Sequence, residues 1–221
     1  MNLMELIIWY LGNIREYALQ MLPCMLLALL VFLSLRPARA SRLERLGLFS
    51  PPERERALML FVMFCAGLAA LTLFPARFWD AGRLHQVFLG ERPLFPAVDL
   101  QSQIRNLQTT PFQEIRRAFR GPWVMFLMLA NIGIFCPLGF FPALLARQPR
   151  WWKSVLIGLG CSCAIEFIQF FIGRSSDVDD VILNTAGALT GYWLFCLLRA
   201  LFPGWIIRFQ CREREEPKWT T

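Results

Sequence analysis

Five separate stretches of the sequence are apolar and long enough to cross a lipid bilayer. A spanning helix needs about 20 mostly apolar residues, since each residue adds about 1.5 Å along the helix axis. In lipid, only a helix satisfies its own backbone hydrogen bonds without closing into a barrel. The sequence therefore predicts five membrane-spanning helices, over residues 17–35, 57–74, 123–146, 154–172 and 181–202.

The composition supports a membrane protein. Of the 221 residues, 56% are hydrophobic and the mean hydropathy is +0.45, which is more apolar material than a soluble core of this size buries. We therefore predict an all-α, polytopic transmembrane helix bundle with about five spans. The opening segment, residues 3–11, is too short to span alone. The sequence leaves open whether it extends the first span or lies at the membrane interface.

The positive charges predict the orientation of the bundle. The net charge is +7, but the arginines flank the apolar runs and form no interleaved aromatic patch, so nucleic-acid binding is not expected. Arginine and lysine are densest in residues 36–56, in residues 147–153 and after residue 199. This bias predicts a cytoplasmic C-terminus and an N-terminus outside. Arg116, Arg117 and Arg120, beside the outer end of the third span, argue against this orientation.

Three segments are predicted along the chain. Residues 1–122 hold two spans and a long extracytoplasmic loop, residues 123–202 hold a core of three spans, and residues 203–221 form a basic cytoplasmic tail. In the long loop, Thr110, Pro111 and Gln113 provide an N-cap, a first-turn proline and a capping-box partner, so a short helix is expected to begin there. Its apolar face suits the membrane interface. A connector helix packed against the bundle explains the pattern equally well.

The cysteines and the histidine do not indicate a metal centre. The cysteines lie mostly within apolar runs, where they act as small hydrophobes, and the spacing of Cys161 and Cys163 matches no common zinc pattern. His85 is the only histidine, so it cannot define a metal centre alone. We expect no cofactor and no metal, with Asp177 and Asp180 as weak candidates for ligands of a divalent cation.

Glu166 is the most unusual residue in the spans, because a carboxylate inside a membrane helix is costly and usually functional. Ser162 and Gln169 share its stripe of the fourth helix. The fifth helix carries a second stripe, formed by Asp177, Asp180, Asn184, Gly187 and Gly191. The glycines of this stripe form a small-xxx-small surface, so the fourth and fifth helices are expected to pack tightly.

The two stripes are predicted to meet Asn131 of the third span in one pocket. At about 1.5 Å per residue, Glu166 lies about 9 Å and Asn131 about 12 Å from the same end of the bundle, and Asn184 lies at a comparable depth. We therefore predict a polar pocket in the outer leaflet. Its expected ligand-binding residues are Asn131, Glu166, Gln169, Arg174, Asp177, Asp180 and Asn184.

These side chains also have structural explanations. For Glu166, the alternative to a functional role, which is slightly favoured, is a protonated acid that hydrogen-bonds a neighbouring helix. The amides are explained by inter-helix bonds of about 1 kcal/mol or less. The aspartates before the fifth span suit a helix cap. Arg174 is expected to meet an aspartate or a phosphate, because the chain would have to turn back to reach Glu166. Pro137, Gly139 and Pro142 are expected to bend or break the third span.

Several of these residues form a pattern that resembles the VanZ-like family. The pattern consists of Asn131, Pro137, Leu138, Gly139, Phe140, Glu166, Gln169, Arg174, Asp177, Asp180, Asn184, Gly187 and Gly191. The resemblance covers mainly residues 123–202, while residues 106–112 resemble the family's Asn-Leu-x-Pro-Phe segment with three added residues. It implies a bacterial multi-spanning protein of the cytoplasmic (inner) membrane and cell envelope. The family is named for a member that confers low-level teicoplanin resistance, a phenotype that family membership does not transfer.

Two classes of function stay open at this point. The leading hypothesis is a binding or accessory protein that recognises a lipid, a lipid-linked envelope precursor or an amphiphile, with membrane lipids as partners and no prediction of oligomeric state. The alternative is an intramembrane hydrolase or transferase with Glu166 as general base, the best catalytic candidate, and with possible metal assistance. A proton-coupled transporter is less favoured, because the sequence lacks the repeated broken helices that transporters often contain.

Overall fold

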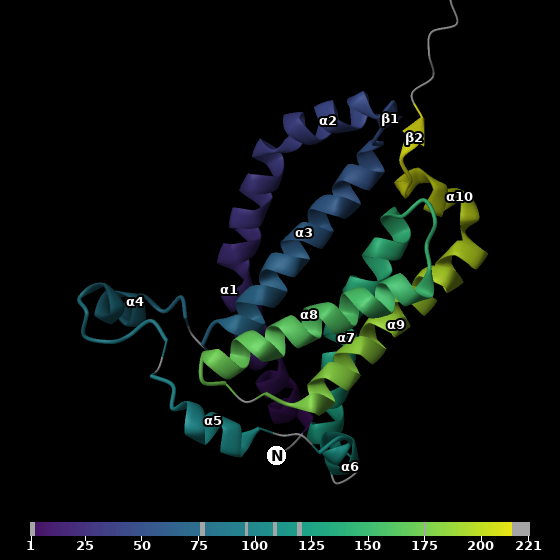
Figure 1. Cartoon of the computed structure of the whole chain (residues 1–221). Helices are drawn as coiled ribbons and strands as arrows, with labels where there is room; N and C mark the ends of the chain where they lie inside the picture. Colours follow the sequence, from purple (N-terminus) through teal and green to yellow (C-terminus); the bar gives the residue numbers. More distant parts are fainter. Residues whose placement is uncertain are drawn as a thin grey trace, which may run out of the picture.

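The computed structural model describes residues 3–75, 78–95, 97–107, 110–118, 121–174 and 176–213. Most of this chain is helical (Figure 1). The α-helices are α1 (Leu3–Ser34), α2 (Arg36–Arg45), α3 (Pro52–Leu73), α4 (Ala81–Phe88), α5 (Leu100–Asn106), α6 (Gln113–Ala118), α7 (Pro122–Leu145), α8 (Trp151–Phe171), α9 (Val178–Leu201) and α10 (Pro203–Ile206). A 3-10 turn, η1 (Ile207–Phe209), and two short strands, β1 (Leu48–Phe49) and β2 (Arg212–Glu213), complete these elements.

Five helices in the described part of the chain are long and apolar enough to cross a membrane: α1, α3, α7, α8 and α9. Each ends one residue before the end of a predicted span and, apart from α1, begins within five residues of the predicted start. The predicted all-α, polytopic bundle is therefore confirmed. Because α1 begins at Leu3, the opening segment extends the first helix.

Successive long helices run in opposite directions, which gives the bundle two ends (Figure 1). We call the end that carries α4, α5 and α6 the loop end. The opposite end carries α2, the β1–β2 pair and α10, and we call it the α2 end. The C-terminus of α8 and the N-terminus of α9 both lie at the loop end, so the predicted polar stripes start from the same level of the bundle.

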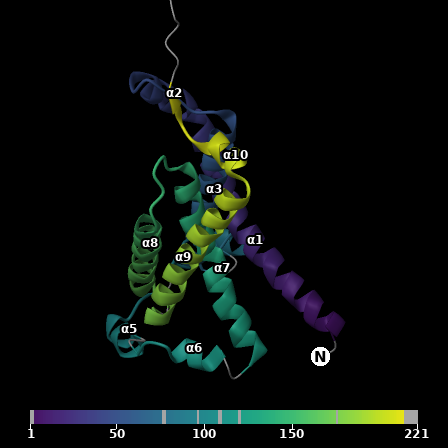
Figure 2. The same cartoon turned by 90° about the vertical axis from the view of Figure 1, so that its right-hand side faces the viewer.

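The helix α9 packs against α7 and also against α8, and these three helices form the larger part of the bundle. The helix α1 packs mainly against α3, which also contacts α7 and α8. In the view turned by 90°, the N-terminal half of α1 leans away from α7 and α9 (Figure 2). In the C-terminal half of α1, Leu27 and Leu30 are 62% and 65% exposed. In a membrane, these two side chains face lipid.

Three glycines bring α7 and α9 into backbone contact: Gly139 of α7, and Gly187 and Gly191 of α9. A Cβ atom at Gly191 would lie 1.9 Å from the carbonyl oxygen of Cys136, and one at Gly139 would lie 1.7 Å from the carbonyl oxygen of Ala188. Small residues permit this approach, which drives helix association in lipid. The helix α8 also packs on α9, where Ser162 of α8 hydrogen-bonds α9. The glycine stripe of α9 therefore faces α7, while α8 covers an adjacent side.

The helix α7 contains Pro137 and Pro142 and is not broken at either one. Of the expected bend or break, the break is therefore absent. Each proline removes one backbone donor, and the close packing against α9 keeps the helix continuous. On the α8 side, Ser154 donates a hydrogen bond of 3.1 Å to the carbonyl oxygen of Gly139.

The long loop contains α4, α5 and α6, where the sequence predicted one short helix. Asp80 and Asp99 cap α4 and α5, since their carboxylates accept the backbone N–H of Arg83 and Gln101. The predicted helix exists as α6, but it begins at Gln113 and not near Thr110. Its start is delayed because Phe112 has a φ of 66°, a left-handed conformation that an α-helix excludes. The helix packs against α7 and touches α9.

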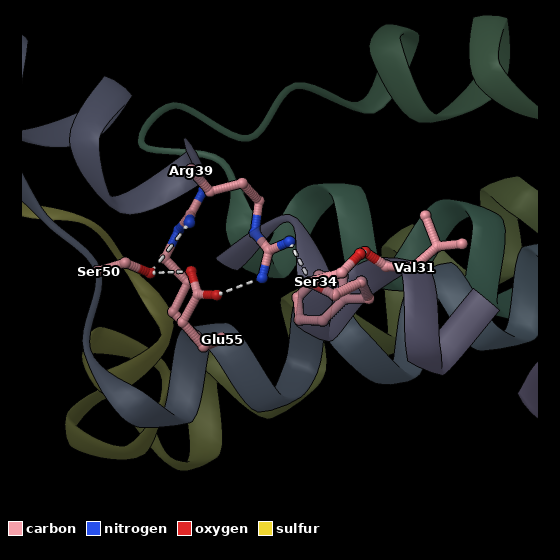
Figure 3. A network of polar contacts seen from close by, with 7 residues as sticks. Val31, Ser34, Arg39, Ser50 and Glu55 are labelled. Atoms are coloured by element: carbon pink, nitrogen blue, oxygen red, sulfur yellow. Dashed lines mark hydrogen bonds and ion pairs between the residues drawn. The ribbon is translucent and has the colours of Figure 1, made fainter. Parts of the chain in front are cut away.

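The α2 end is held together by contacts between segments far apart in the sequence. The strand β1 pairs with β2 in an antiparallel register that places Leu48 opposite Glu213, which ties the C-terminal segment to the first loop. Arg147, after α7, forms a 2.9 Å ion pair with Glu213. A second group of polar contacts joins α1, α2 and α3 around Arg39 (Figure 3).

Candidate functional site

The turn between α8 and α9 creates the local geometry of the site. The helix α8 ends at Phe171, and Gly173 follows with a φ of 77°, which glycine adopts without a Cβ clash. The backbone N–H of Arg174 donates to the carbonyl oxygen of Gln169 at 3.0 Å, which is the Schellman ending of a helix. The chain reverses here, so that α9 begins beside the end of α8.

This reversal brings Glu166 to the start of α9. The backbone N–H of Asp177 donates to Oε2 of Glu166 at 3.0 Å, and the Ser176 hydroxyl also hydrogen-bonds this carboxylate. The side chain of Asp177 caps α9 by accepting the backbone N–H of Asp179 at 2.9 Å. Glu166 is buried. The turned-back chain also brings the charge of Arg174 close enough to attract Glu166.

Two side-chain hydrogen bonds join α9 to its neighbours at this level. Asn131 of α7 donates from Nδ2 to Oδ1 of Asp180 at 2.7 Å. Asn184 of α9, one turn deeper, donates to the hydroxyl of Ser162 in α8 at 2.9 Å, and both residues are buried. The predicted meeting of three helices at one depth is therefore present in the structure, as direct bonds between the helices.

Gln169 and Arg174 face α3 and not α9. The Gln169 side chain donates to the carbonyl oxygen of Thr72 at 2.9 Å, and the Arg174 guanidinium donates to the carbonyl oxygen of Phe74 at 3.0 Å. The last carbonyl groups of a helix have no partner within the helix. Donors from α8 and from the turn after it therefore satisfy the C-terminal end of α3.

Gln20 completes this arrangement and was missed by the sequence reasoning. From α1, its side-chain amide donates to the carbonyl oxygens of Ala70 and Phe74 at 3.2 and 3.1 Å. The backbone carbonyl oxygen of Gln20 accepts the indole N–H of Trp79 at 2.9 Å. A glutamine inside the apolar first span was the signal that could have identified it.

Asp179 is the second residue whose role was underestimated. Its side chain is completely buried, and its carboxylate accepts the backbone N–H of Phe112. The sequence favoured a plain cap for this aspartate. The structure instead uses it to fix the segment before α6 on the start of α9.

All seven predicted ligand-binding residues lie at the loop end, but they form two groups. Glu166, Asp177 and Asp180 belong with Asn131 and Asn184 to the α7–α8–α9 group, whereas Gln169 and Arg174 contact α3. With Asp179, the first group is rich in carboxylates, which when ionised only accept hydrogen bonds. Among the described residues, no three His, Cys, Asp or Glu side chains gather closely enough to hold a metal ion.

The fold and this site together define a class of protein, a polytopic α-helical membrane protein with an acidic polar cluster between its helices. The chain belongs to the VanZ/LLP1 family, whose family model matches residues 60–199. The match covers more than half of the chain, contains all seven predicted site residues and begins within α3, earlier than the resemblance at residue 123. Searches of curated proteins and of solved structures gave no significant match.

Proposed function

We propose that this protein is a binding or accessory protein of the bacterial cell envelope, which recognises a lipid, a lipid-linked precursor or an amphiphile at the loop end. The observation that carries this proposal is the bond between Glu166 and the backbone N–H of Asp177. It holds an acid inside a membrane-spanning helix beside the start of α9. Acids at such depth are expensive and mark ligand or ion sites more often than packing contacts.

The chemistry of the cluster suggests what the ligand presents. Glu166, Asp177 and Asp180 offer carboxylate oxygens, and Arg174 is the cation that acts on Glu166. A group rich in acceptors favours a ligand with hydrogen-bond donors, such as sugar or glycerol hydroxyls or an ammonium group. The exposed apolar side chains of α8, such as Phe167 and Phe171 at 66% and 51% exposure, lie near the same level and suit the lipid part.

We place the loop end outside and the α2 end in the cytoplasm of a bacterial inner membrane. The support is the arginine-rich α2, which carries Arg36, Arg42 and Arg45 as exposed residues. Arg116 and Arg117 of α6 lie at the loop end and are evidence against this orientation. A periplasm-active reporter and a cytoplasm-active reporter, each fused to the C-terminus, test this orientation. Activity of the periplasmic reporter alone would reverse it.

The binding proposal is tested by Glu166→Gln, with Glu91→Gln as the matched control. The first change removes the ionisable carboxyl group and keeps an acceptor for Asp177, while Glu91 is an exposed carboxylate at the same end. Purified protein in nanodiscs would be titrated with a polyprenyl-phosphate-linked sugar, whose headgroup carries hydroxyls, and with phosphatidylethanolamine, whose headgroup carries an ammonium group, and binding would be measured by native mass spectrometry. We expect weaker binding of at least one probe to Glu166→Gln alone. Unchanged binding of both probes would contradict the proposal.

The alternative, an intramembrane hydrolase or transferase, has one observation in its favour. The backbone N–H of Asp177 fixes the carboxylate of Glu166, and a general base needs such a fixed orientation. Turnover of a lipid-linked substrate by the purified protein, lost in Glu166→Gln, would favour this alternative. Metal dependence of that turnover would support a role for Asp177 and Asp180. Binding without turnover would favour the accessory protein.

A further inference from the structure

The opposite end of the bundle, away from the acidic cluster, contains a cavity that the proposed function does not use. This cavity of about 540 Å³ opens between α3, α7 and the α10–η1 segment, within the usual size range of ligand pockets. Its walls are mostly apolar and aromatic: Leu60, Phe140, Phe141, Leu144, Trp205 and Phe209. Arg56 and Arg208 also line it, together with Glu53. The cavity thus joins an apolar interior with a positively charged edge.

The walls are held in place by packing. Leu144 is 2% exposed and belongs to a buried cluster against which Phe140, Phe141 and Phe209 pack. The rings of Phe61 and Phe141 are stacked with centroids 5.5 Å apart, and those of Trp205 and Phe209 meet edge to face at 4.7 Å. The cavity is therefore bordered by supported side chains and does not depend on a mobile loop.

The level of the cavity in the bundle identifies its surroundings. Leu144 is next to the last residue of α7, and Arg56 lies in the second turn of α3, so both are near the end of a span. Trp205, in the short helix after α9, is 43% exposed, and tryptophan is enriched at the boundary between lipid and water. The apolar part of the cavity therefore lies at the depth of acyl chains, and the arginines lie at the depth of phosphate groups.

The charged edge favours an anion. Arg56 and Glu53 form a long ion pair of 3.5 Å, with side chains that are 69% and 36% exposed, and such exposed pairs are weak. Arg208 is exposed and has no acidic partner within the described part of the chain. Two arginines against one glutamate leave a positive edge, and guanidinium groups bind phosphate with directed hydrogen bonds.

We propose that this cavity binds one anionic phospholipid of the surrounding bilayer, with its phosphate at Arg56 and Arg208 and one acyl chain over Phe140, Phe141 and Leu144. Basic pockets between membrane helices are suited to such headgroups. A cavity with apolar walls does not hold water well, and the adjacent bilayer supplies acyl chains. This proposal does not depend on the function of the loop-end cluster.

A neighbouring cavity provides a competing location for the same headgroup. It measures about 330 Å³, is lined by Arg36 and Arg56 among others, and lies on the side of α3 that faces α1 and α2. Arg56 borders both cavities, whereas Arg36 borders only this one and Arg208 only the larger one. Single substitutions of Arg36 and Arg208 therefore separate the two locations.

The test uses the delipidated full-length protein in detergent, titrated with phosphatidylglycerol or phosphatidylcholine and followed by native mass spectrometry. We expect one phosphatidylglycerol to bind more tightly than phosphatidylcholine. The Arg56→Gln/Arg208→Gln protein should bind it about tenfold more weakly. The control Arg42→Gln/Arg45→Gln removes the same charge from exposed positions of α2 at the same end and should change binding less than about twofold.

A further variant tests the apolar wall of the cavity. Leu60→Trp alters a 53% exposed wall position without a change in charge, and it should also weaken binding by narrowing the cavity. Equal losses in both double variants would show general attraction to the basic surface and would overturn the proposal. So would equal binding of the two lipids, a larger loss in Arg36→Gln than in Arg208→Gln, or displacement by free glycerol phosphate, which has no acyl chain.

Discussion

The backbone N–H of Asp177 donates a hydrogen bond to Glu166 that spans 11 residues and measures 3.0 Å. It closes the reversal at Gly173, so the carboxylate in α8 and the start of α9 are held as one unit. Glu166 is 7% exposed. A buried donor that loses its acceptor costs free energy, which gives this contact a structural role that is separable from ligand binding.

The first prediction separates these two roles by comparing Glu166→Gln with Glu166→Ala. Glutamine keeps a carbonyl oxygen for the Asp177 N–H, so we expect the free energy of unfolding to change by about 1 kcal/mol or less. Alanine leaves this donor without its partner and should lower that free energy by about 1–3 kcal/mol. Thermal and denaturant unfolding in detergent would measure both. Equal destabilisation by the two changes would argue against the hydrogen bond.

The second prediction concerns the backbone contact between α7 and α9. Gly139→Ala places a Cβ on the carbonyl oxygen of Ala188 and has no room to relax without separating the helices. We expect a loss of about 3 kcal/mol or more in the free energy of unfolding. Gly133→Ala is the control in the same helix, because a Cβ there meets nothing within 4 Å.

The control has an expected sign of its own. Alanine is a better helix former than glycine by about 1 kcal/mol, so Gly133→Ala should be neutral or slightly stabilising. Yield of folded protein and resistance to denaturant would be compared for the two variants. If Gly139→Ala unfolded no more easily than Gly133→Ala, the result would contradict the close backbone contact between α7 and α9.

The third prediction is a coupling between Ser162 and Asn184, the buried pair that joins α8 to α9. Polar pairs in membrane bundles contribute about 0.6 kcal/mol on average and up to about 1.7 kcal/mol. A double-mutant cycle with Ser162→Ala and Asn184→Ala should therefore give a coupling in this range. A control cycle pairs Ser162→Ala with Thr190→Ala and should give a coupling near zero, because the exposed Thr190 hydroxyl bonds only within α9. A coupling near zero for Ser162 and Asn184 would contradict a stabilising hydrogen bond between α8 and α9.

The spans could be predicted from the sequence because a bilayer demands a minimum length of apolar helix, and this demand is local to each segment. The common depth of Asn131, Glu166 and Asn184 followed from the same boundaries. The partner of each polar side chain could not be predicted, because helical periodicity gives a direction around one helix and not the neighbour on that side. The glycine stripe of α9 illustrates this, since the sequence suggested α8 as its partner and the structure places α7 there.

Gln169 and Arg174 show a second limit of the sequence. Both lie in the predicted polar stripe or just beyond it, and both donate to carbonyl groups at the end of α3. Their acceptors are the backbone carbonyl oxygens of Thr72 and Phe74, and the side-chain types of these two residues do not predict this pairing. What the sequence did contain was Gln20, an unexplained amide in the first span, which contacts the same end of α3.

The last prediction concerns Arg39 in α2, which joins three helices at the α2 end. Its guanidinium donates to Glu55 at 3.2 Å (Figure 3). It also donates to the carbonyl oxygen of Phe32 at 2.6 Å and lies 3.6 Å from the ring centroid of Phe32. Phe32 is in the last turn of α1, where a cation meets the negative end of the helix dipole and a carbonyl without a partner in the helix.

Arg39→Ala should therefore lower the free energy of unfolding by about 1–3 kcal/mol, because it removes bonds that involve a charged group. Arg39→Lys should recover only part of this, since lysine lacks the planar fork that reaches the two acceptors together. Arg42→Ala, an exposed position in the same helix, should change it by about 0.5 kcal/mol or less. Thermal unfolding in detergent at low and high salt would compare the three variants. If Arg39→Lys fully restored the free energy of unfolding, or if Arg39→Ala and Arg42→Ala lowered it equally, Arg39 would contribute only its positive charge.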